Sequence, residues 1–411
     1  MKLPYIALLT AFVAFIVSLL AYPYLLRIAY KYNIVDNPNA RKLQREPVPV
    51  FGGPAVWIGV LCGVMFALCF VTSRNMPMAL AAMSFMMFIG IVDDIRDLPA
   101  SWRFIIEIVV VWSMMALSGR FIDDFHGLWG IHDVSTFISY PLSLLAGVGI
   151  INAINLIDGV DGYSSGYGVF ACIMFALLFF ASGVATIGYL AMAIGGALVP
   201  FFLHNVFGKK SKMFIGDGGT LMLGVAIVIM MFNVLYSDSL CCKFHYNDEG
   251  LGLVPFCLAV LAIPVFDTVR VMGMRIFRGF SPFKPDKTHL HHLFIDLHFS
   301  HIGTTVTILT INSFIVLAWF LSWKLGASID LQMYVVCFLG ILVTFIFYPF
   351  MRWHERRDTL FYKRCCAVGW MTHIARTGFW EFMMKLMDWG RGYDKINSGA
   401  NSGDDSRAKT A

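Results

Sequence analysis

Long hydrophobic runs separated by short polar segments dominate this chain. The first run, residues 6–26, is long enough to cross a bilayer, which takes about 20 apolar residues. It is too long for the core of a signal peptide and no clear cleavage site follows it, so we expect an uncleaved helix. Ten further runs lie at residues 54–71, 77–92, 104–117, 137–151, 166–181, 185–202, 221–236, 253–272, 305–322 and 333–350. The pattern predicts an all-α polytopic membrane protein with about eleven transmembrane helices.

Composition agrees with this prediction. Hydrophobic residues make up 58% of the 411 positions and charged residues only 14%, which is outside the range of soluble domains. The net charge of +5 is modest and no long basic run occurs, so we expect no nucleic-acid polymer as a partner.

The Lys and Arg residues fall mainly in the loops on one side of the predicted bundle. The loops on the other side hold only Arg74, Arg120, Lys243 and Lys324. Because cytoplasmic loops carry an excess of Lys and Arg, we expect the N-terminus outside and the C-terminus in the cytoplasm. We divide the chain into a transmembrane domain (1–351), a cytoplasmic juxtamembrane amphipathic segment (352–395) with a headgroup-level helix near 373–389, and a disordered tail (396–411).

Four polar clusters interrupt the apolar pattern, and this topology places all of them at the cytoplasmic face. Ionisable residues this close to hydrocarbon are costly, so each cluster is a candidate functional site. Taken alone, each could also be a plain polar turn between helices, and their shared location favours one joint site. The clusters are Asp93-Asp94, the stretch N-A-I-N-L-I-D-G-V-D-G with Asn152, Asn155, Asp158 and Asp161, the stretch F-I-G-D-G-G-T with Asp217, and H-L-H-H with His289, His291 and His292.

The acidic clusters predict a hard metal cation. Carboxylates gathered near one another repel, and oxygen ligands of this kind favour Mg²⁺, which keeps several waters and bridges to substrate phosphates. Asp217 lies among glycines at the expected start of a helix, where backbone amides can approach an anion. A simple turn at this position is the alternative. The predicted active site is therefore at the cytoplasmic membrane face.

The histidine cluster favours an anion site over a metal site. Three histidines in four residues could hold a metal, but Arg275, Arg278, Lys284 and Lys287 lie nearby and would attract an anion. Phosphate or pyrophosphate binding is the better interpretation, with a solvated basic loop as the alternative. Lys42 lies in a second cationic loop. A site for a metal and a phosphate compound at the membrane interface predicts a phosphorylated lipid as substrate, since the chain of such a lipid cannot leave the bilayer.

Six motifs in order resemble the polyprenyl-phosphate N-acetylhexosamine-1-phosphate transferases. The likeness extends over roughly residues 20–325, and H-L-H-H is similar to the WecA/TagO-like branch, whereas the MraY-like branch typically has three consecutive histidines. The family pattern R-K-x-H reads R-K-L-Q here, so we assign no role to Gln44. The motifs are D-N-P-N-A-R-K with P-V-P-V-F-G-G, I-V-D-D-I-R-D, N-A-I-N-L-I-D-G-V-D-G, F-I-G-D-G-G-T, P-V-F-D-T-V-R and K-P-D-K-T-H-L-H-H-L.

The resemblance implies a reaction. A UDP-N-acetylhexosamine, expected to be UDP-GlcNAc, would donate its sugar 1-phosphate to undecaprenyl phosphate, releasing UMP and starting a cell-envelope polysaccharide such as lipopolysaccharide. It also implies a bacterial inner-membrane location and allows a homodimer. The implied roles are catalysis for Asp93 and Asp94, binding of Mg²⁺ (or Mn²⁺ in its place) for Asp217 and Asp158, and substrate binding for Lys42, Asn152, Asn155, Asp161, Arg270, His289, His291 and His292.

Three alternatives remain open at this stage. The donor could be UDP-MurNAc-pentapeptide, as in the MraY-like branch, or another UDP-sugar. The lipid phosphate could attack directly or through a covalent aspartyl intermediate. An ion-coupled transporter also has many spans and intramembrane acids, but its sites usually lie near the bilayer midplane, often in repeated halves.

Overall fold

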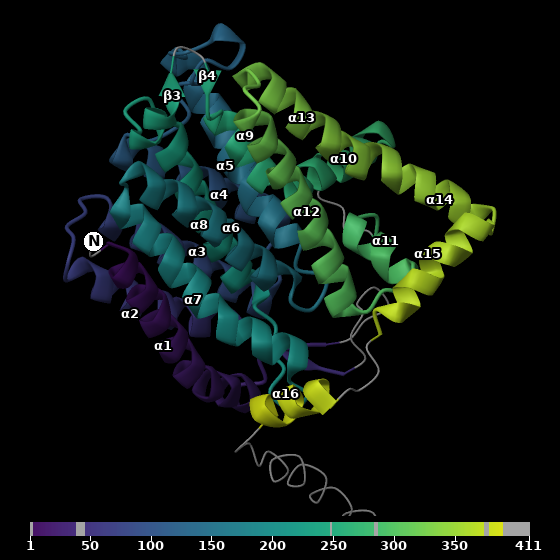
Figure 1. Ribbon diagram of the computed structural model, residues 1–411. Helices are drawn as coiled ribbons and strands as arrows, with labels where there is room; N and C mark the ends of the chain where they lie inside the picture. Colours follow the sequence, from purple (N-terminus) through teal and green to yellow (C-terminus); the bar gives the residue numbers. More distant parts are fainter. Residues whose placement is uncertain (1–2, 38–45, 247–248, 283–286, 374–377, 389–411) are drawn as a thin grey trace, which may run out of the picture.

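The computed structural model describes residues 3–37, 46–246, 249–282, 287–373 and 378–388 as an almost entirely helical bundle (Figure 1). Lys42 and the predicted disordered tail lie outside the described residues. The predicted fold class, an all-α multi-pass membrane protein, is confirmed. The helices that form the bundle are α1 (Leu3–Lys31), α2 (Gly52–Leu68), α3 (Met76–Arg96), α4 (Ala100–Ser118), α5 (Thr136–Leu156), α6 (Tyr163–Ser182), α7 (Ala185–Phe207), α8 (Gly216–Leu235), α9 (Leu253–Val260), α10 (Ala262–Phe277), α12 (His301–Lys324) and α13 (Ile329–Ile341).

Nine helical segments in the described part of the chain are long and apolar enough to cross a membrane. They coincide with nine of the eleven predicted spans, and the last of them, Ile329–Arg356, runs from α13 into α14 (Tyr348–Arg356). The second predicted span is α2, which has only 17 residues. The orientation of the bundle in the membrane remains a prediction.

The predicted span at residues 253–272 is not one straight helix. It consists of α9 and α10, which meet at an angle of 73°. Pro264 in the first turn of α10 has no N–H to continue the helical ladder. Asn312 of α12 accepts a hydrogen bond from the backbone N–H of Ile263 and donates to the carbonyl oxygens of Ala259 and Val260. A side chain from a neighbouring helix therefore satisfies the backbone groups that the break leaves free.

Helix α8 is the centre of the bundle. Every residue of α8 except Asp217 is buried, which suits a helix that is apolar on every side. Helix α3 packs against it most closely at Gly90, where an added methyl group would lie less than 3.0 Å from the backbone of Asp217 and Gly218. This contact fixes the end of α3, with its two acids, beside the first turn of α8.

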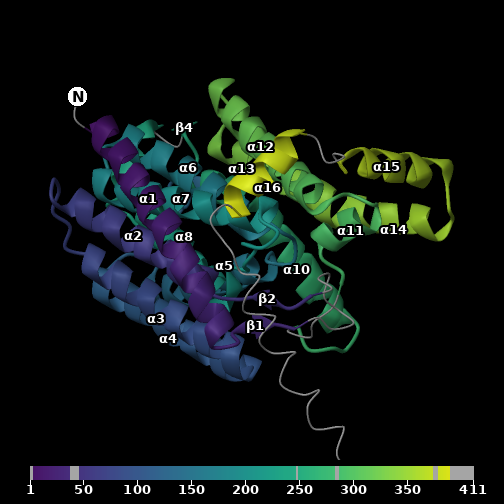
Figure 2. The same ribbon diagram turned by 90° about the horizontal axis from the view of Figure 1, so that it is seen from below.

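Short extended segments tie two sequence motifs together at that end of the bundle (Figure 2). Strand β1 (Val35–Asp36) pairs with β2 (Val48–Pro49), and Val50 forms a parallel bridge with Phe214. The backbone N–H groups of Gly52 and Gly53 donate to the carbonyl oxygens of Phe214 and Ile215 at 2.9 Å. The glycines of P-V-P-V-F-G-G thus hold the loop that precedes Asp217.

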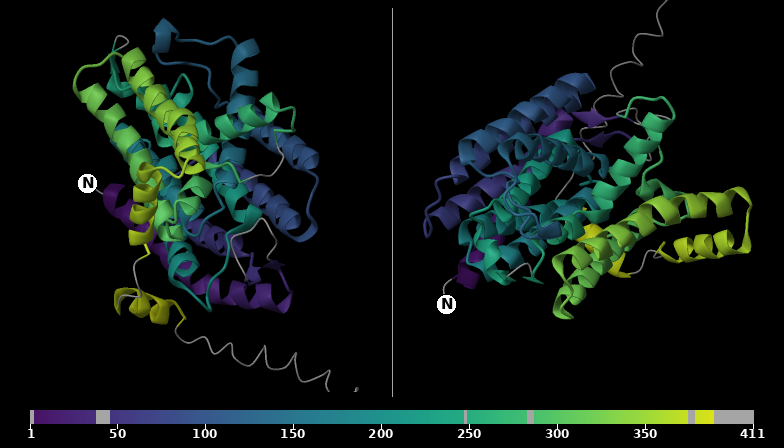
Figure 3. Two further views of the ribbon diagram at one scale, coloured as in Figure 1. Left: turned by 90° about the vertical axis from the view of Figure 1, so that its right-hand side faces the viewer. Right: turned by 90° about the horizontal axis from the view of Figure 1, so that it is seen from above.

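The remaining elements are short or lie outside the bundle. The hairpin of α14 and α15 projects to one side, and α16 lies across one end of the bundle (Figure 3). The amphipathic segment predicted at 352–395 therefore includes helices, although its division from the rest of the chain stays a prediction. These elements are η1 (Leu128–Gly130), η2 (Leu240–Phe244), β3 (His245–Tyr246), β4 (Glu249–Gly250), α11 (Leu290–Asp296), the π-helical turn η3 (Leu342–Phe347), α14 (Tyr348–Arg356), α15 (Leu360–Met371) and α16 (Gly378–Asp388).

Candidate active site

An acid-rich cleft of about 610 Å³ opens at the end of the bundle where α3 ends and α6 and α8 begin. Three of the four predicted polar clusters contribute acids to its wall, and the fourth contributes one histidine. The polar lining residues are Asp36, Asp93, Asp94, Asp97, Asp158, Asp161, Asn205, Lys212, Asp217, His292 and His301. Five of the acids predicted from sequence therefore share one cavity.

Asp94 closes the beginning of α8. Its carboxylate accepts hydrogen bonds from the backbone N–H groups of Asp217 and Gly218, at 3.0 and 3.2 Å. Gly216 has a φ of 71°, a conformation that favours glycine, and a side chain there would collide with Asp94. The sequence predicted that backbone amides here can approach an anion, and in the structure the carboxyl group of Asp94 occupies these amides.

Asp93 and Asp217 share one guanidinium group. Arg103 Nη1 lies 3.0 Å from Asp93 Oδ2 and 3.3 Å from Asp217 Oδ2. The other oxygen of Asp93 accepts from the backbone N–H of Leu98 at 2.7 Å. Both acids are thus held in place by fixed donors, and Arg103 offsets part of their repulsion.

The two predicted asparagines have different surroundings. Asn155 donates from Nδ2 to Asp217 Oδ1 at 2.7 Å, so it takes part in the acid cluster. Asn152 is buried and donates to Glu107, whose carboxylate lies 3.6 Å from Arg103 Nε. Asn152 therefore contacts Arg103 indirectly, through Glu107, and is not among the residues that line the cleft, so its predicted substrate contact stays a prediction.

Asp158 and Asp161 lie on the turn between α5 and α6 and line the cleft. The surrounding protein limits the hydration of the Asp158 carboxylate, and Asp217 and Asp161 add negative charge, so the pKa of Asp158 rises to about 7 even though its side chain is open to the cleft. Burial also acts to raise the pKa of Asp161, but His301 and Lys212 outweigh it and the pKa is lowered. The pKa values of these two groups, three residues apart, are thus shifted in opposite directions.

The two glycines of D-G-V-D-G serve different purposes. Gly162 has a φ of 77°, a conformation that favours glycine and allows the chain to turn sharply before α6. Gly159 leaves room for the ring of His291, because an added methyl group would lie less than 3.0 Å from His291 Nε2. The first glycine therefore allows a close approach between the acidic turn and the histidine segment.

The histidine cluster is mostly structural. His289 Nδ1 lies 3.0 Å from Asp267, and Arg270 donates to the same carboxylate at 2.6 Å while its guanidinium stacks on Tyr348. His291 is buried, and its burial lowers the pKa of the imidazole well below the usual value, so this ring is neutral. Of the three histidines in this cluster, only His292 lines the cleft. Asp267 thus anchors Arg270 and His289, and the predicted binding of a diphosphate by Arg270, His289 and His291 stays a prediction.

Four further residues of the site had no motif to mark them. Arg103 and Glu107 lie one helical turn apart on α4, and Lys212 precedes Asp217 by five residues. Lys212 Nζ lies 2.6 Å and His301 Nδ1 2.8 Å from Asp161 Oδ2. The i, i+4 spacing of Arg103 and Glu107 at an apolar run could have marked them as an ion pair. No sequence pattern marked His301 as part of the site.

A preformed cage for a metal is lacking among the described residues, where no three His, Cys, Asp or Glu side chains are arranged as its ligands. Mg²⁺ does not require one, since it commonly takes one or two carboxylates together with waters and phosphate oxygens. Seven aspartates and only two basic or imidazole nitrogen groups other than His292, namely Lys212 and His301, line the described cleft, so carboxyl groups predominate there. The donor set is oxygen-rich and suits a hard cation.

Comparison with known proteins places the chain among membrane glycosyltransferases. Residues 76–234 match the model of glycosyl transferase family 4. The chain is 30% identical over 360 residues to a probable undecaprenyl-phosphate N-acetylglucosaminyl 1-phosphate transferase of Bacillus subtilis, covering 84% of this chain and 96% of that protein. The undecaprenyl-phosphate alpha-N-acetylglucosaminyl 1-phosphate transferases of Yersinia pestis and Escherichia coli K12 are 29% and 28% identical, covering 67% of this chain and 73% and 72% of theirs.

Proposed function

The chain belongs to glycosyl transferase family 4, and we propose that it transfers N-acetylglucosamine 1-phosphate from UDP-GlcNAc to undecaprenyl phosphate. The similarity to the Bacillus subtilis protein along 96% of that protein's length supports the proposal most strongly. The acids of the motif-bearing loops line one cleft at the end of a membrane bundle, where a lipid phosphate and a soluble nucleotide can meet.

The chemistry is a phosphoryl transfer without a demanding proton transfer. An oxygen of the lipid phosphate forms a bond to the phosphorus attached to the sugar, and the bond from that phosphorus to UMP breaks, with UMP taking the electron pair. A phosphate monoester has a second pKa near 6, so the attacking group is already mostly dianionic at neutral pH. The harder task is to bring two anions together in a cleft lined by seven aspartates, which requires positive charge and in-line positioning.

The protein's own cations supply part of that charge. Lys212 and His301 lie on the wall of the cleft at Asp161, and Arg103 lies between Asp93 and Asp217. We propose that Asp217 and Asp158 hold Mg²⁺, with Mn²⁺ as a substitute. Bound there, the ion would neutralise carboxylate and phosphate charge. Asp93, fixed by Arg103, would orient the attacking phosphate or accept a residual proton; a covalent aspartyl intermediate is the competing route.

A donor panel tests the reaction. Purified protein would be given undecaprenyl phosphate and Mg²⁺ with UDP-GlcNAc, UDP-GalNAc or UDP-MurNAc-pentapeptide, and UMP release would be measured. We expect release with UDP-GlcNAc only, abolished by omitting the lipid or adding EDTA and restored by Mg²⁺. Release with the pentapeptide donor would assign the MraY-like reaction, and solute counterflow without UMP would support a transporter.

Arg103→Gln is expected to lower kcat/KM for this reaction by at least about tenfold, equivalent to about 1.4 kcal/mol. The substitution leaves Asp93, Asp217 and Glu107 without their shared cation. Arg96→Gln is the matched control, because Arg96 is exposed at the end of α3. Equal activity of both variants in UMP release would contradict a role for Arg103.

The proposal also includes the cellular location of the enzyme and its orientation in the membrane. We propose that it lies in the bacterial inner membrane with the cleft facing the cytoplasm, where UDP-sugars are made. Labelling of Arg96→Cys and Arg74→Cys variants with a membrane-impermeant thiol reagent in whole cells would test this, since the two positions lie at opposite ends of the bundle. The homodimer stays a prediction that the mass of the solubilised protein would test.

A further inference from the structure

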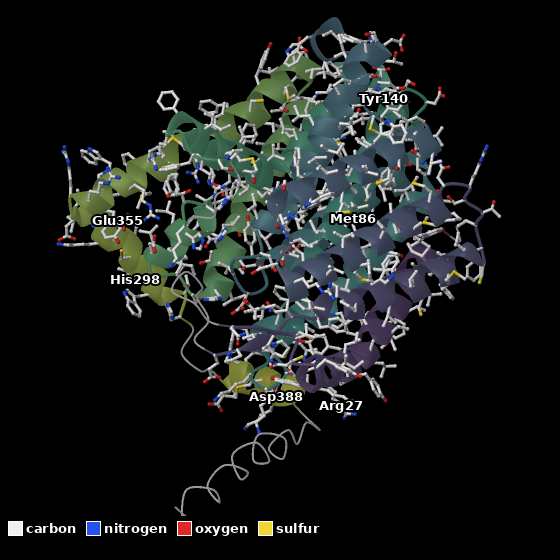
Figure 4. The ribbon with its side chains drawn as sticks, turned by 180° about the vertical axis from the view of Figure 1, so that it is seen from behind. Arg27, Met86, Tyr140, His298, Glu355 and Asp388 are labelled. Atoms are coloured by element: carbon white, nitrogen blue, oxygen red, sulfur yellow. The ribbon has the colours of Figure 1, made fainter. Side chains whose placement is uncertain are left out.

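The last helix of the described chain contacts the loop that carries a cation of the cleft. Helix α16 lies across the end of the bundle, and its final residue, Asp388, is labelled in Figure 4 close to the end of α1. The aromatic ring of Phe207, at the end of α7, packs against Phe379 and Trp380 of α16 with ring centroids 6.3 and 4.7 Å apart. The helix is therefore docked on the bundle by side-chain packing.

Asp388 binds three consecutive backbone amides. Its carboxylate accepts hydrogen bonds from the N–H groups of Lys209 at 3.3 Å, Lys210 at 3.1 Å and Ser211 at 2.9 Å. Successive N–H groups that converge on one anion form a nest, and a carboxylate is a strong acceptor for it. Asp388 therefore fixes the backbone conformation of the turn between α7 and α8.

The same turn is held from its inner side. Tyr22 donates from its hydroxyl to the carbonyl oxygen of Ser211 at 2.8 Å, and the Ser211 hydroxyl lies 3.1 Å from His204 Nδ1. Asn205 donates to the carbonyl oxygen of Met213 at 3.0 Å and accepts from the N–H of Gly162 at 2.6 Å. The turn thus lies between α16 outside and the acidic D-G-V-D-G segment inside.

Lys212 connects this turn to the cleft. It follows directly after the three amides that Asp388 binds, and its ammonium group lies 2.6 Å from Asp161 Oδ2. The position of this cation among the acids depends on the path of residues 209–211. A displacement of the turn would leave Asp161 with His301 alone and would remove a positive charge from the wall of the cleft.

We propose that Asp388 is a positioning residue of the cleft, which holds Lys212 against Asp161 through the amides of residues 209–211. Helix α16 is then part of the active-site structure, although it contributes no group to the cleft wall. The kinetic consequence rests on the proposed function, because it assumes that Lys212 favours binding of the UDP-sugar. The structural consequence, an ordered turn at residues 209–212, is independent of the proposed function.

Asp388→Ala and Asp388→Asn, in the full-length chain, test the proposal. Glu381→Gln is the matched control, since it removes one carboxylate from an exposed position of the same helix. We expect both Asp388 variants to raise KM for UDP-GlcNAc about fivefold with kcat changed less than twofold. Amide hydrogen exchange of residues 209–213 should become faster in the Asp388 variants and stay unchanged in the control.

A double-mutant cycle identifies the route of the effect. If Asp388 acts through Lys212, Asp388→Ala should leave KM unchanged in a Lys212→Met background. Additive effects on KM, or exchange rates at 209–213 equal to those of wild type, would overturn the proposal. If wild type shows no turnover of UDP-GlcNAc, the proposed function fails, and the exchange measurement still decides whether Asp388 orders the turn.

Discussion

Asp217→Asn is expected to reduce UMP release by roughly 10²–10³-fold, the range found when one preorganised electrostatic contact to the reacting group is lost. The substitution keeps the shape of the side chain. It removes the negative charge that faces Arg103 at 3.3 Å and the carboxylate that accepts from Asn155 at 2.7 Å. A cation held by Asp217 would lose its principal ligand, so the Mg²⁺ concentration needed for half-maximal activity should also rise.

The control for this substitution is Asp238→Asn. Asp238 is exposed after the end of α8, at the opposite end of that helix from Asp217, so its loss should leave turnover unchanged. The measurement is UMP release by both variants over a Mg²⁺ series, in protein shown to be folded by its thermal transition. Wild-type turnover in Asp217→Asn would remove the metal assignment from this residue.

Gly90→Ala is expected to destabilise the protein by about 3 kcal/mol and to reduce UMP release at least tenfold. The added methyl group would lie less than 3.0 Å from backbone atoms of Asp217 and Gly218, which cannot rotate away as a side chain would. Helices α3 and α8 must therefore separate. This movement would shift Asp93 and Asp94 relative to the first turn of α8.

A matched glycine separates this effect from helix propensity. Gly149 lies within α5, and an added methyl group there meets nothing within 4 Å. Gly149→Ala should be neutral or stabilising by up to about 1 kcal/mol, because alanine is the better helix former. Thermal unfolding of both variants in the same detergent is the measurement. Equal stability of both would show that α3 and α8 are not packed as closely as described.

The sequence by itself determined that the chain is a helical membrane protein and which loops carry its chemistry. A run of about 20 apolar residues in a bilayer has few stable structures other than a helix, so most span positions follow from local composition. Acids at the ends of such runs are costly, so their gathering in one cleft could be expected from topology. Asp93, Asp94, Asp158, Asp161 and Asp217 all line that cleft.

Only the tertiary structure decided what each polar side chain contacts. Asp94 binds the first turn of α8, Asn152 supports Glu107, and Asp267 holds Arg270 and His289 away from the cleft. The break between α9 and α10 is likewise stabilised by Asn312, about 50 residues further along the chain. These partners come from separate helices, and no periodicity within one segment encodes where two helices meet. Long-range packing therefore determines which groups each polar side chain contacts. The local sequence predicts only that these side chains belong to one site.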